Sequence, residues 1–244
     1  MKAKEVAAKP LLINQNTLAT TARNMLYKTK KRTAFVIDDK KKLTGAITLK
    51  TIMSLASLRS NLTAKDIADR PAPMVDEEET LESVAKKMVQ RGAKEIAVVR
   101  NNELTGVIDT TSMMPLGSIP SMKIKDMGLK KAEAVENKTP LPKIIGKLKK
   151  HATLAVTKDG KLEGVITRTE VAIRRYQARD LNSSTTAEKM MNTPAISVDA
   201  NGDIADAARI MIAKNIHALP VVEKGKPVGI ITRLDILKEM TGWK

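Results

Sequence analysis

The sequence PVGIITRLD at residues 227–235 decides the fold, because its apolar-Gly-apolar centre occurs four times along the chain at nearly equal intervals. The four glycines stand 61, 58 and 65 residues apart, at Gly45, Gly106, Gly164 and Gly229. Self-similarity at a fixed period is typical of a chain built from repeated structural units. We therefore predict four repeats, called here the first to fourth copies. Their expected boundaries are 1–58, 59–118, 119–180 and 181–244.

Each copy shows the same order of predicted elements. An apolar run precedes each glycine, for example LPVV at residues 219–222, and polar turn residues such as KDGK at 158–161 separate the two runs. Two such runs joined by a tight turn predict a β-hairpin. A short extended piece and an amphipathic helix come before each hairpin, and a second helix follows it. This order predicts an α/β (α+β) fold of β-α-β-β-α units that pack in pairs, because about 60 residues bury too little surface alone.

Composition excludes several classes of protein. The 244 residues include no cysteine, which excludes disulfides, thiolate metal sites and a cysteine nucleophile, and which favours a reducing, cytoplasmic location. No apolar run reaches the 18 residues that a membrane span needs, so no membrane partner is expected. Neither a Walker loop nor a GxGxxG fingerprint is present, and the two histidines lack a neighbouring nucleophile motif. We therefore expect a protein that is not an enzyme and requires no cofactor.

The combined pattern resembles cystathionine-β-synthase (CBS) domains. The resemblance rests on the strand around Pro220, the segment 229–235 (GIITRLD) and the lead-in 187–191 (AEKMM), and it extends over all four copies. It implies that the first copy pairs with the second and the third with the fourth, as two Bateman modules that form a disc. A four-copy chain of this kind is similar to the nucleotide-sensing gamma subunit of AMP-activated kinase. The resemblance implies a regulatory protein whose ligand is an adenosine nucleotide, namely AMP, ADP, ATP or S-adenosylmethionine.

Thr232 and Asp235 in the fourth copy are the first candidate ligand-binding residues. Thr232 ends a predicted strand, and Asp235 follows in the first turn of the next helix. A carboxylate there can accept hydrogen bonds from ribose hydroxyls, while the Thr hydroxyl and helix-start amides can meet phosphate. In CBS families this spacing is similar to a motif that binds adenosine nucleotides. The alternative interpretation is that Thr232 caps the helix and Asp235 complements its dipole.

The other copies retain this pair unequally. The third copy has Thr167 and Glu170, which keep the acid on a longer side chain. The second copy has Asp109 and Ser112, and the first has Thr48 and Thr51; neither has an acid at the ribose position. We therefore expect the third and fourth copies to form the functional binding half.

Basic residues near this motif are candidates for phosphate contact. His151 and His217 both precede the second strand of their copies, within one residue of the place occupied by Arg32 and Lys94 in the others. By the resemblance, a basic residue here faces phosphate, whereas the alternative is a cation at a solvated helix end. Arg168 and Arg233 follow the Thr of each motif and either neutralise phosphates or are exposed.

The resemblance also implies residues that contact the purine. They lie at the entry to the first strand and along the second strand of the fourth copy: Thr193, Ala195, Ile196, Ala218 and Pro220. The apolar residues among them would also be expected in the hydrophobic core, with or without a ligand, so their identities add little evidence for binding.

The net charge of +16 supports a second hypothesis, a nucleic-acid-binding protein. The surplus lies in the first and third copies, which carry +9 and +8, while the second and fourth carry −2 and +1. It includes Lys143, Lys147, Lys149 and Lys150, and a later group formed by Arg174, Arg175 and Arg179. Such clusters can hold a phosphate backbone, although a solvated basic surface explains them equally. A third hypothesis is a scaffold that regulates a partner enzyme or transporter in trans, either as a monomer or as a homodimer.

Overall fold

The computed structural model describes residues 1–55, 61–114, 119–177 and 181–242, with side chains described to residue 174 in the third of these ranges. The chain divides into two compact units, Met1–Met113 and Met114–Gly242. Each unit contains two three-stranded sheets, so the first copy shares a unit with the second and the third with the fourth, as predicted. The boundaries expected at 58, 118 and 180 fall on residues outside the described ranges, as does Arg179.

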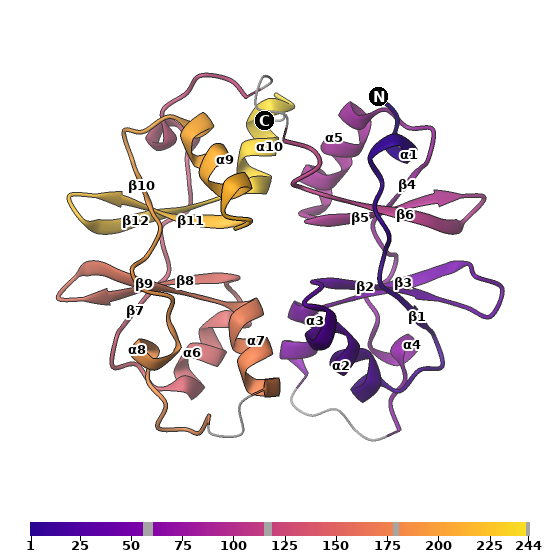
Figure 1. The fold of residues 1–244 in the computed structure, drawn as a ribbon, viewed down its shortest axis with the longest axis horizontal. Helices are drawn as coiled ribbons and strands as arrows, with labels where there is room; N and C mark the ends of the chain where they lie inside the picture. The colour runs from indigo at the N-terminus through magenta and orange to yellow at the C-terminus, as the bar shows by residue number, and fades with distance from the viewer. Residues whose placement is uncertain (56–60, 115–118, 178–180, 243–244) are drawn as a thin grey trace. The chain divides into compact units, whose positions relative to one another are not determined.

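Unit 1 holds the first two sheets (Figure 1). In chain order its elements are α1 (Ala3–Val6), β1 (Leu12–Asn14), α2 (Ala19–Thr29), β2 (Thr33–Ile37), β3 (Leu43–Thr48), α3 (Leu49–Ser54), α4 (Ala64–Ile67), β4 (Met74–Asp76), α5 (Leu81–Arg91), β5 (Glu95–Arg100) and β6 (Glu103–Asp109).

Unit 2 repeats the arrangement. Its elements are η2 (Ile124–Met127), β7 (Ala134–Glu136), α6 (Leu141–Leu148), β8 (Thr153–Lys158), β9 (Lys161–Thr167), α7 (Arg168–Gln177), α8 (Ala187–Met190), β10 (Val198–Asp199), α9 (Ile204–Ala213), β11 (Ala218–Glu223), β12 (Lys226–Thr232) and α10 (Arg233–Met240).

Every sheet has the same topology, which confirms the predicted order of elements. The first strand pairs parallel to the second, and the second and third form an antiparallel hairpin, as in β10-β11-β12. A parallel pair needs a crossover connection, and the amphipathic helix between the two strands supplies it. In α9 this helix begins at Asp203, whose side chain accepts a hydrogen bond from the Ala205 amide, and it buries Ile204, Ala207, Ala208 and Met211.

The segment that precedes the first strand of each copy packs on the other copy of its unit. We call these segments lead-ins; they contain α1, α4, η2 and α8. In unit 2, Asn192 and Val165 exchange two backbone hydrogen bonds of 2.9 and 3.1 Å, which join the fourth lead-in to β9 of the third copy. The third lead-in joins the fourth copy through the Ile124 amide and the Gly202 carbonyl, 2.9 Å apart. The two copies of a unit therefore exchange these segments, and their spatial boundaries differ from the repeat boundaries in the sequence.

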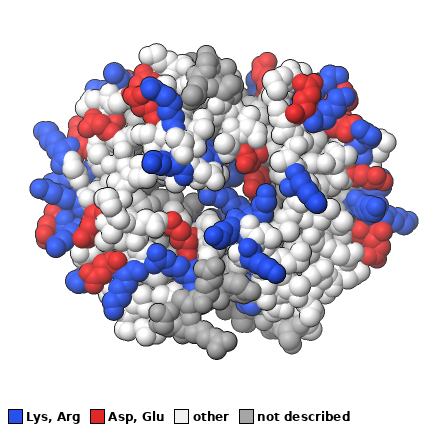
Figure 2. Space-filling view, viewed as in Figure 1, with Lys and Arg blue, Asp and Glu red and all other residues white. Residues whose placement is uncertain are grey.

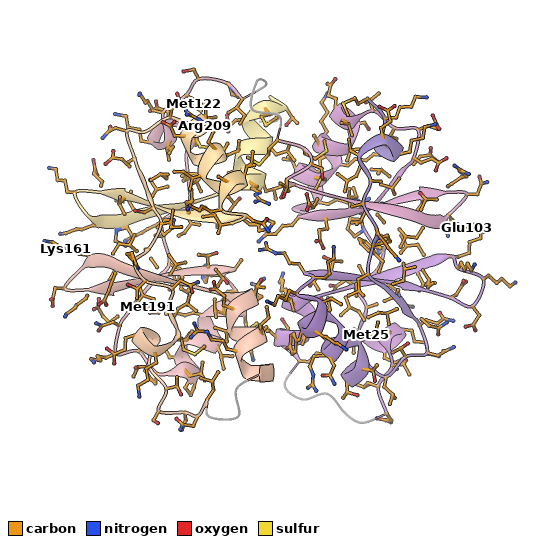
Figure 3. The ribbon with its side chains drawn as sticks, viewed as in Figure 1. Met25, Glu103, Met122, Lys161, Met191 and Arg209 are labelled. Carbon is orange, nitrogen blue, oxygen red and sulfur yellow. The ribbon has the colours of Figure 1, made fainter. Side chains whose placement is uncertain are left out.

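This exchange explains the glycine of the first three copies, Gly45, Gly106 and Gly164. At Gly164 an added Cβ would lie 2.5 Å from Sδ of Met191 and 2.9 Å from the carbonyl oxygen of Asn192, both in the crossing lead-in. Figure 3 labels Met191 beside the sheet that it crosses. At Gly106 the added atom would lie 2.6 Å from Cβ of Ala7 in the first lead-in. In these copies the strand needs glycine because the lead-in of the other copy passes directly over it. At Gly229 the crossing segment lies farther away, and the nearest atom to an added Cβ would be Cβ of Leu129 at 3.5 Å.

Aliphatic and methionine side chains form the cores. One cluster joins α9, β11, β12 and α10 to the third lead-in through Met114 and Ile124. A second cluster contains residues of both sheets of unit 1, among them Phe35, Ala97 and Val99, so it connects the two copies. Among the described residues, no helix is long and apolar enough to span a bilayer.

Candidate functional site

Thr232 and Asp235 form a reciprocal pair at the start of α10. The carboxylate Oδ2 of Asp235 accepts hydrogen bonds from the Thr232 amide at 2.8 Å and from the Thr232 hydroxyl at 2.6 Å. The Thr232 Oγ1 in turn accepts from the Asp235 amide at 3.2 Å. This is a capping box, which satisfies amides that the first turn of a helix leaves without partners. The structure therefore supports the helix-capping interpretation of these residues.

Thr167 and Glu170 repeat the arrangement at the start of α7. Oε2 of Glu170 accepts from the Thr167 amide at 3.0 Å and from the Thr167 hydroxyl at 2.8 Å. Its second oxygen, Oε1, accepts from the amide side chain of Asn192 in the fourth lead-in. Both oxygens of this carboxylate are therefore engaged within the protein.

The first copy also has an acid at this place, which sequence analysis missed. Thr48 caps α3 together with Thr51, and the Thr51 hydroxyl donates to Oδ2 of Asp69 at 2.5 Å. Asp69 belongs to the second lead-in, and its backbone pairs with Ala46 as that of Asn192 pairs with Val165. An alignment of the four lead-ins with one another would have identified Asp69, because it places Asp69 at the position of Asn192. In the second copy, Asp109 accepts from the Thr111 amide at 2.8 Å.

Arg233 is buried, with 1% of its surface exposed, so of the two alternatives for this residue, phosphate neutralisation and simple exposure, the second is wrong. Its Nη2 donates to the carbonyl of Met211 at 2.7 Å, near the C-terminal end of α9. A cation there interacts favourably with the helix dipole. Arg168 does the same in the third copy, where its Nε donates to the Leu148 carbonyl at 2.8 Å. Burial lowers the pKa of Arg168 from its ordinary value.

Backbone hydrogen bonds establish which histidine corresponds to which residue. The Arg233 amide donates to the His217 carbonyl at 3.1 Å, and the Arg168 amide donates to the Ala152 carbonyl at 2.9 Å. His217 therefore corresponds to Ala152, and His151 stands one residue earlier. The imidazole of His217 lies against the guanidinium of Arg233, with ring nitrogens 3.2 and 3.4 Å from Nη1. His151 instead lies 3.8 Å from the Glu133 carboxylate, measured from Nε2 to Oε2.

The residues expected to contact a purine lie on two elements. Thr193, Ala195 and Ile196 belong to the stretch between α8 and β10. The Thr193 hydroxyl donates to the Glu163 carbonyl at 3.1 Å, and Ile196 is 43% exposed. Ala218 and Pro220 lie on β11, where Ala218 is the cross-strand partner of Thr232 and Pro220 is buried opposite Ile230. The structure thus places Ala218 and His217 beside the Thr232–Asp235 pair.

Other chemistries are less well supported by the described residues. Within them, no group of three or more His, Asp or Glu side chains could hold a metal ion. The charged residues at the hairpin turns of unit 2, residues 158–161 and 223–226, include both signs, and blue and red side chains lie side by side at that edge in Figure 2. Of the three arginines near the end of α7, the structure describes only the side chain of Arg174, whose Nη1 donates to the Lys189 carbonyl at 3.0 Å.

A family model described as the CBS domain matches residues 3–57, 64–114, 124–175 and 187–242. These four matches cover most of the chain and correspond to the four copies.

Two solved structures share the whole fold. Protein MJ1225 of Methanocaldococcus jannaschii, described as a candidate archaeal homologue of g-AMPK, has a TM-score of 0.84 at 19% identity and covers 98% of this chain and 99% of its own. An uncharacterized conserved protein of Pyrococcus horikoshii has a TM-score of 0.69 at 22% identity, over 98% of this chain and 100% of its own. At these identities the likeness concerns the fold.

Curated relatives match over shorter stretches. Protein MJ1404 of Methanocaldococcus jannaschii is 52% identical over 56 residues, 22% of this chain and 13% of that protein. Protein MJ1232 of the same organism is 32% identical over 134 residues, 53% of this chain and 43% of that protein. The matches therefore span less than half the length of these relatives.

Proposed function

Because the chain belongs to the CBS domain family, we propose that it is a regulatory protein that senses an adenosine nucleotide or S-adenosylmethionine between its third and fourth copies. The observation that carries this proposal is the Thr232–Asp235 pair at the start of α10. It brings a carboxylate, a hydroxyl and helix-start amides to one place, next to His217 on the same copy. These groups match the ribose and phosphate of a nucleotide.

The ribose is assigned to Asp235. The bonds to Thr232 use Oδ2, so an incoming ribose hydroxyl would donate to Oδ1 without opening the helix start. Hydrogen bonds to a charged acceptor are worth about 1.5–3 kcal/mol. In the third copy both oxygens of Glu170 already accept hydrogen bonds, which supports the fourth copy as the principal site.

The phosphate is assigned to His217 and to the Thr232 hydroxyl, with Arg233 behind them; the hydroxyl must turn its single hydrogen from Asp235 to the ligand to make this contact. The guanidinium of Arg233 is held by the Met211 carbonyl and lies against the imidazole, so it adds a fixed positive charge without needing to touch the ligand. The N-terminus of α10 adds its own partial positive charge. The exposed side chain of Ile196, with Ala195 beside it, supplies an apolar face for the purine.

Ligand binding changes the relative position of the third and fourth copies, because some of the site residues belong to the lead-in segment that connects them. Thr193 is tied to the third copy through the Glu163 carbonyl, whereas β10 belongs to the sheet of the fourth. A ligand shifts such an arrangement only by its difference in affinity between two states. The regulated protein is then a partner enzyme or transporter that binds unit 2 in only one of those two states.

Isothermal titration calorimetry of the full chain tests the proposal. AMP, ADP, ATP and S-adenosylmethionine are titrated in parallel with GMP and with 2′-deoxy-AMP and 3′-deoxy-AMP. The proposal predicts saturable binding of at least one adenosine ligand, and about 10-fold or greater loss when the hydroxyl that meets Asp235 is absent, as one charged hydrogen bond requires. Absence of binding by every adenosine ligand, or equal affinity for the ribose and both deoxyribose forms, contradicts it.

A further inference from the structure

The third copy contains a basic hollow. Its lining includes His151, a candidate for phosphate contact, and none of the residues discussed for contact with ribose or purine. It has a volume of about 450 Å³ and lies against α6. Its lining residues are Glu133, Lys143, Gly146, Lys147, Lys150 and His151. The volume lies within the range of about 300–1,000 Å³ that small-molecule sites occupy. We call this feature the α6 hollow.

The charge of the α6 hollow is strongly unbalanced. Three lysines face one carboxylate, that of Glu133, which forms an ion pair with Lys147. The hydrogen bond from Lys147 lowers the pKa of Glu133, so this acid stays ionised at neutral pH. Lys143 and Lys147 stand four residues apart and Lys147 and Lys150 three apart, at spacings where like charges repel. The unliganded helix therefore carries a repulsion that a bound anion would relieve.

Gly146 provides the second observation. It lies inside α6 and is exposed, and an added Cβ would meet no atom within 4 Å. Glycine disfavours a helix interior relative to alanine, and here no close backbone contact within the described chain requires it. A side chain at this position would project into the α6 hollow, so glycine keeps the hollow open.

The other copies lack this combination. Aligned from the start of each helix, Gly146 corresponds to Asn24 in α2, Lys86 in α5 and Arg209 in α9. In the fourth copy, Arg209 (Figure 3) forms an ion pair with Asp206, the residue that corresponds to Lys143. The third copy thus has a lysine where the fourth has an acid, and a glycine where the fourth has an arginine. The fourth copy has an internal ion pair at these positions, and the third has an open basic surface.

We propose that the α6 hollow binds a multiply charged phosphate compound, at a site separate from the Thr232–Asp235 pair. Lys143 and Lys150 contribute charge and N–H donors from exposed positions, and Lys147 is held beside them by Glu133. Lysine ammonium groups bind phosphate oxygens through charge-assisted hydrogen bonds. Three lysines against one carboxylate leave the hollow with a net positive charge, so the attraction increases with the number of negative charges on the ligand. The proposal stands on these residues and does not depend on nucleotide binding by the fourth copy.

The test uses the full chain and tripolyphosphate as the probe, titrated by calorimetry at low and at moderate salt. The double variant Lys143→Gln/Lys150→Gln removes two charges from the hollow, and Lys224→Gln/Lys226→Gln, at the turn of the β11–β12 hairpin, is the control with the same loss of charge. We expect the first to weaken binding at least 10-fold and the control less than 3-fold. Gly146→Ala should raise the melting temperature and weaken tripolyphosphate binding. A variant that had lost structure would instead show a lower melting temperature together with weaker binding.

Three results overturn the proposal. One is no binding of tripolyphosphate at low salt. Another is an equal loss in both double variants, which indicates attraction by net charge alone. The third is binding of a single-stranded or duplex oligonucleotide through Lys143 and Lys150 without binding of tripolyphosphate, which would assign this surface to nucleic acid instead.

Discussion

The guanidinium of Arg233 donates from Nη2 to the Met211 carbonyl at 2.7 Å, so a permanent charge lies buried at the C-terminal end of α9. Arg168 and Leu148 form the corresponding contact in the third copy. The residue after the motif Thr thus connects the second helix of each of these copies to the end of the first. In this way the start of α10, where ligand binding is proposed, is coupled to the packing of α9.

Replacement of Arg233 should therefore destabilise unit 2. Arg233→Met leaves the buried Met211 carbonyl without its charged donor, and we expect a loss of about 2–3 kcal/mol in the free energy of unfolding. Urea denaturation followed by circular dichroism measures it. Arg168→Met, at a partly exposed position, should cost less. An effect of Arg233→Met no larger than that of Arg168→Met would contradict the importance of this burial.

The crossing of Met191 over Gly164 gives a second prediction. Gly164→Ala places a Cβ 2.9 Å from the Asn192 carbonyl oxygen, and overpacking of this kind costs about 1–3 kcal/mol. Gly229→Ala is the matched control, since its nearest neighbour would be Cβ of Leu129 at 3.5 Å. Thermal unfolding should give a lower melting temperature for Gly164→Ala than for Gly229→Ala. Equal melting temperatures would show that the fourth lead-in is not tightly packed on β9.

These two contacts also show where prediction from sequence ends. The hairpins, the repeated glycine and the capping pair were predictable, because strand alternation and the three-residue spacing of Thr232 and Asp235 are local properties of the chain. The exchange of lead-ins was not, because it depends on contacts such as Asn192 with Val165 that carry no periodic signal. For the same reason Asp69 was missed, although it reaches Thr51 in space. Burial of Arg233 contradicts the usual exposure of arginine, and only its neighbours explain it.

Acid should weaken the attachment of the start of the first lead-in. Hydrogen bonds from Lys2 and Lys4 lower the pKa of Glu78 from its ordinary value of 4.5 to about 2. A lowered carboxyl pKa contributes stability that is present above the ordinary value and is lost as the pH falls through about 2. Amide hydrogen exchange at Ala3 and Lys4, whose amides donate to the carbonyls of Glu79 and Glu77, should therefore accelerate between pH 4.5 and 2 relative to intrinsic rates. In Glu78→Gln the protection should be low throughout this range; acid acceleration that persists there would contradict the assignment.

Glu95 should have the opposite pH dependence. Burial raises the pKa of this carboxyl, which stands at the start of β5 opposite Asp109. A raised carboxyl pKa means that the folded state binds its proton more tightly, so this group favours folding at low pH and opposes it once the pH exceeds the folded pKa. Glu95→Gln should raise the urea midpoint at pH 7 and flatten its pH dependence near the acid range. A lower midpoint at pH 7 would show that the ionised carboxylate is stabilised by its surroundings instead.

The central claim is that Asp235 holds the sugar of an adenosine ligand. Calorimetric titration of the preferred ligand into Asp235→Ala, compared with the parent chain and with Thr51→Ala, tests it most directly. Both variants remove a helix-start partner and should cost about 1 kcal/mol of stability, but only one removes the ribose acceptor. We expect at least a 10-fold loss of affinity in Asp235→Ala and parental affinity in Thr51→Ala. Parental affinity in Asp235→Ala, or the same loss in both variants, would contradict it.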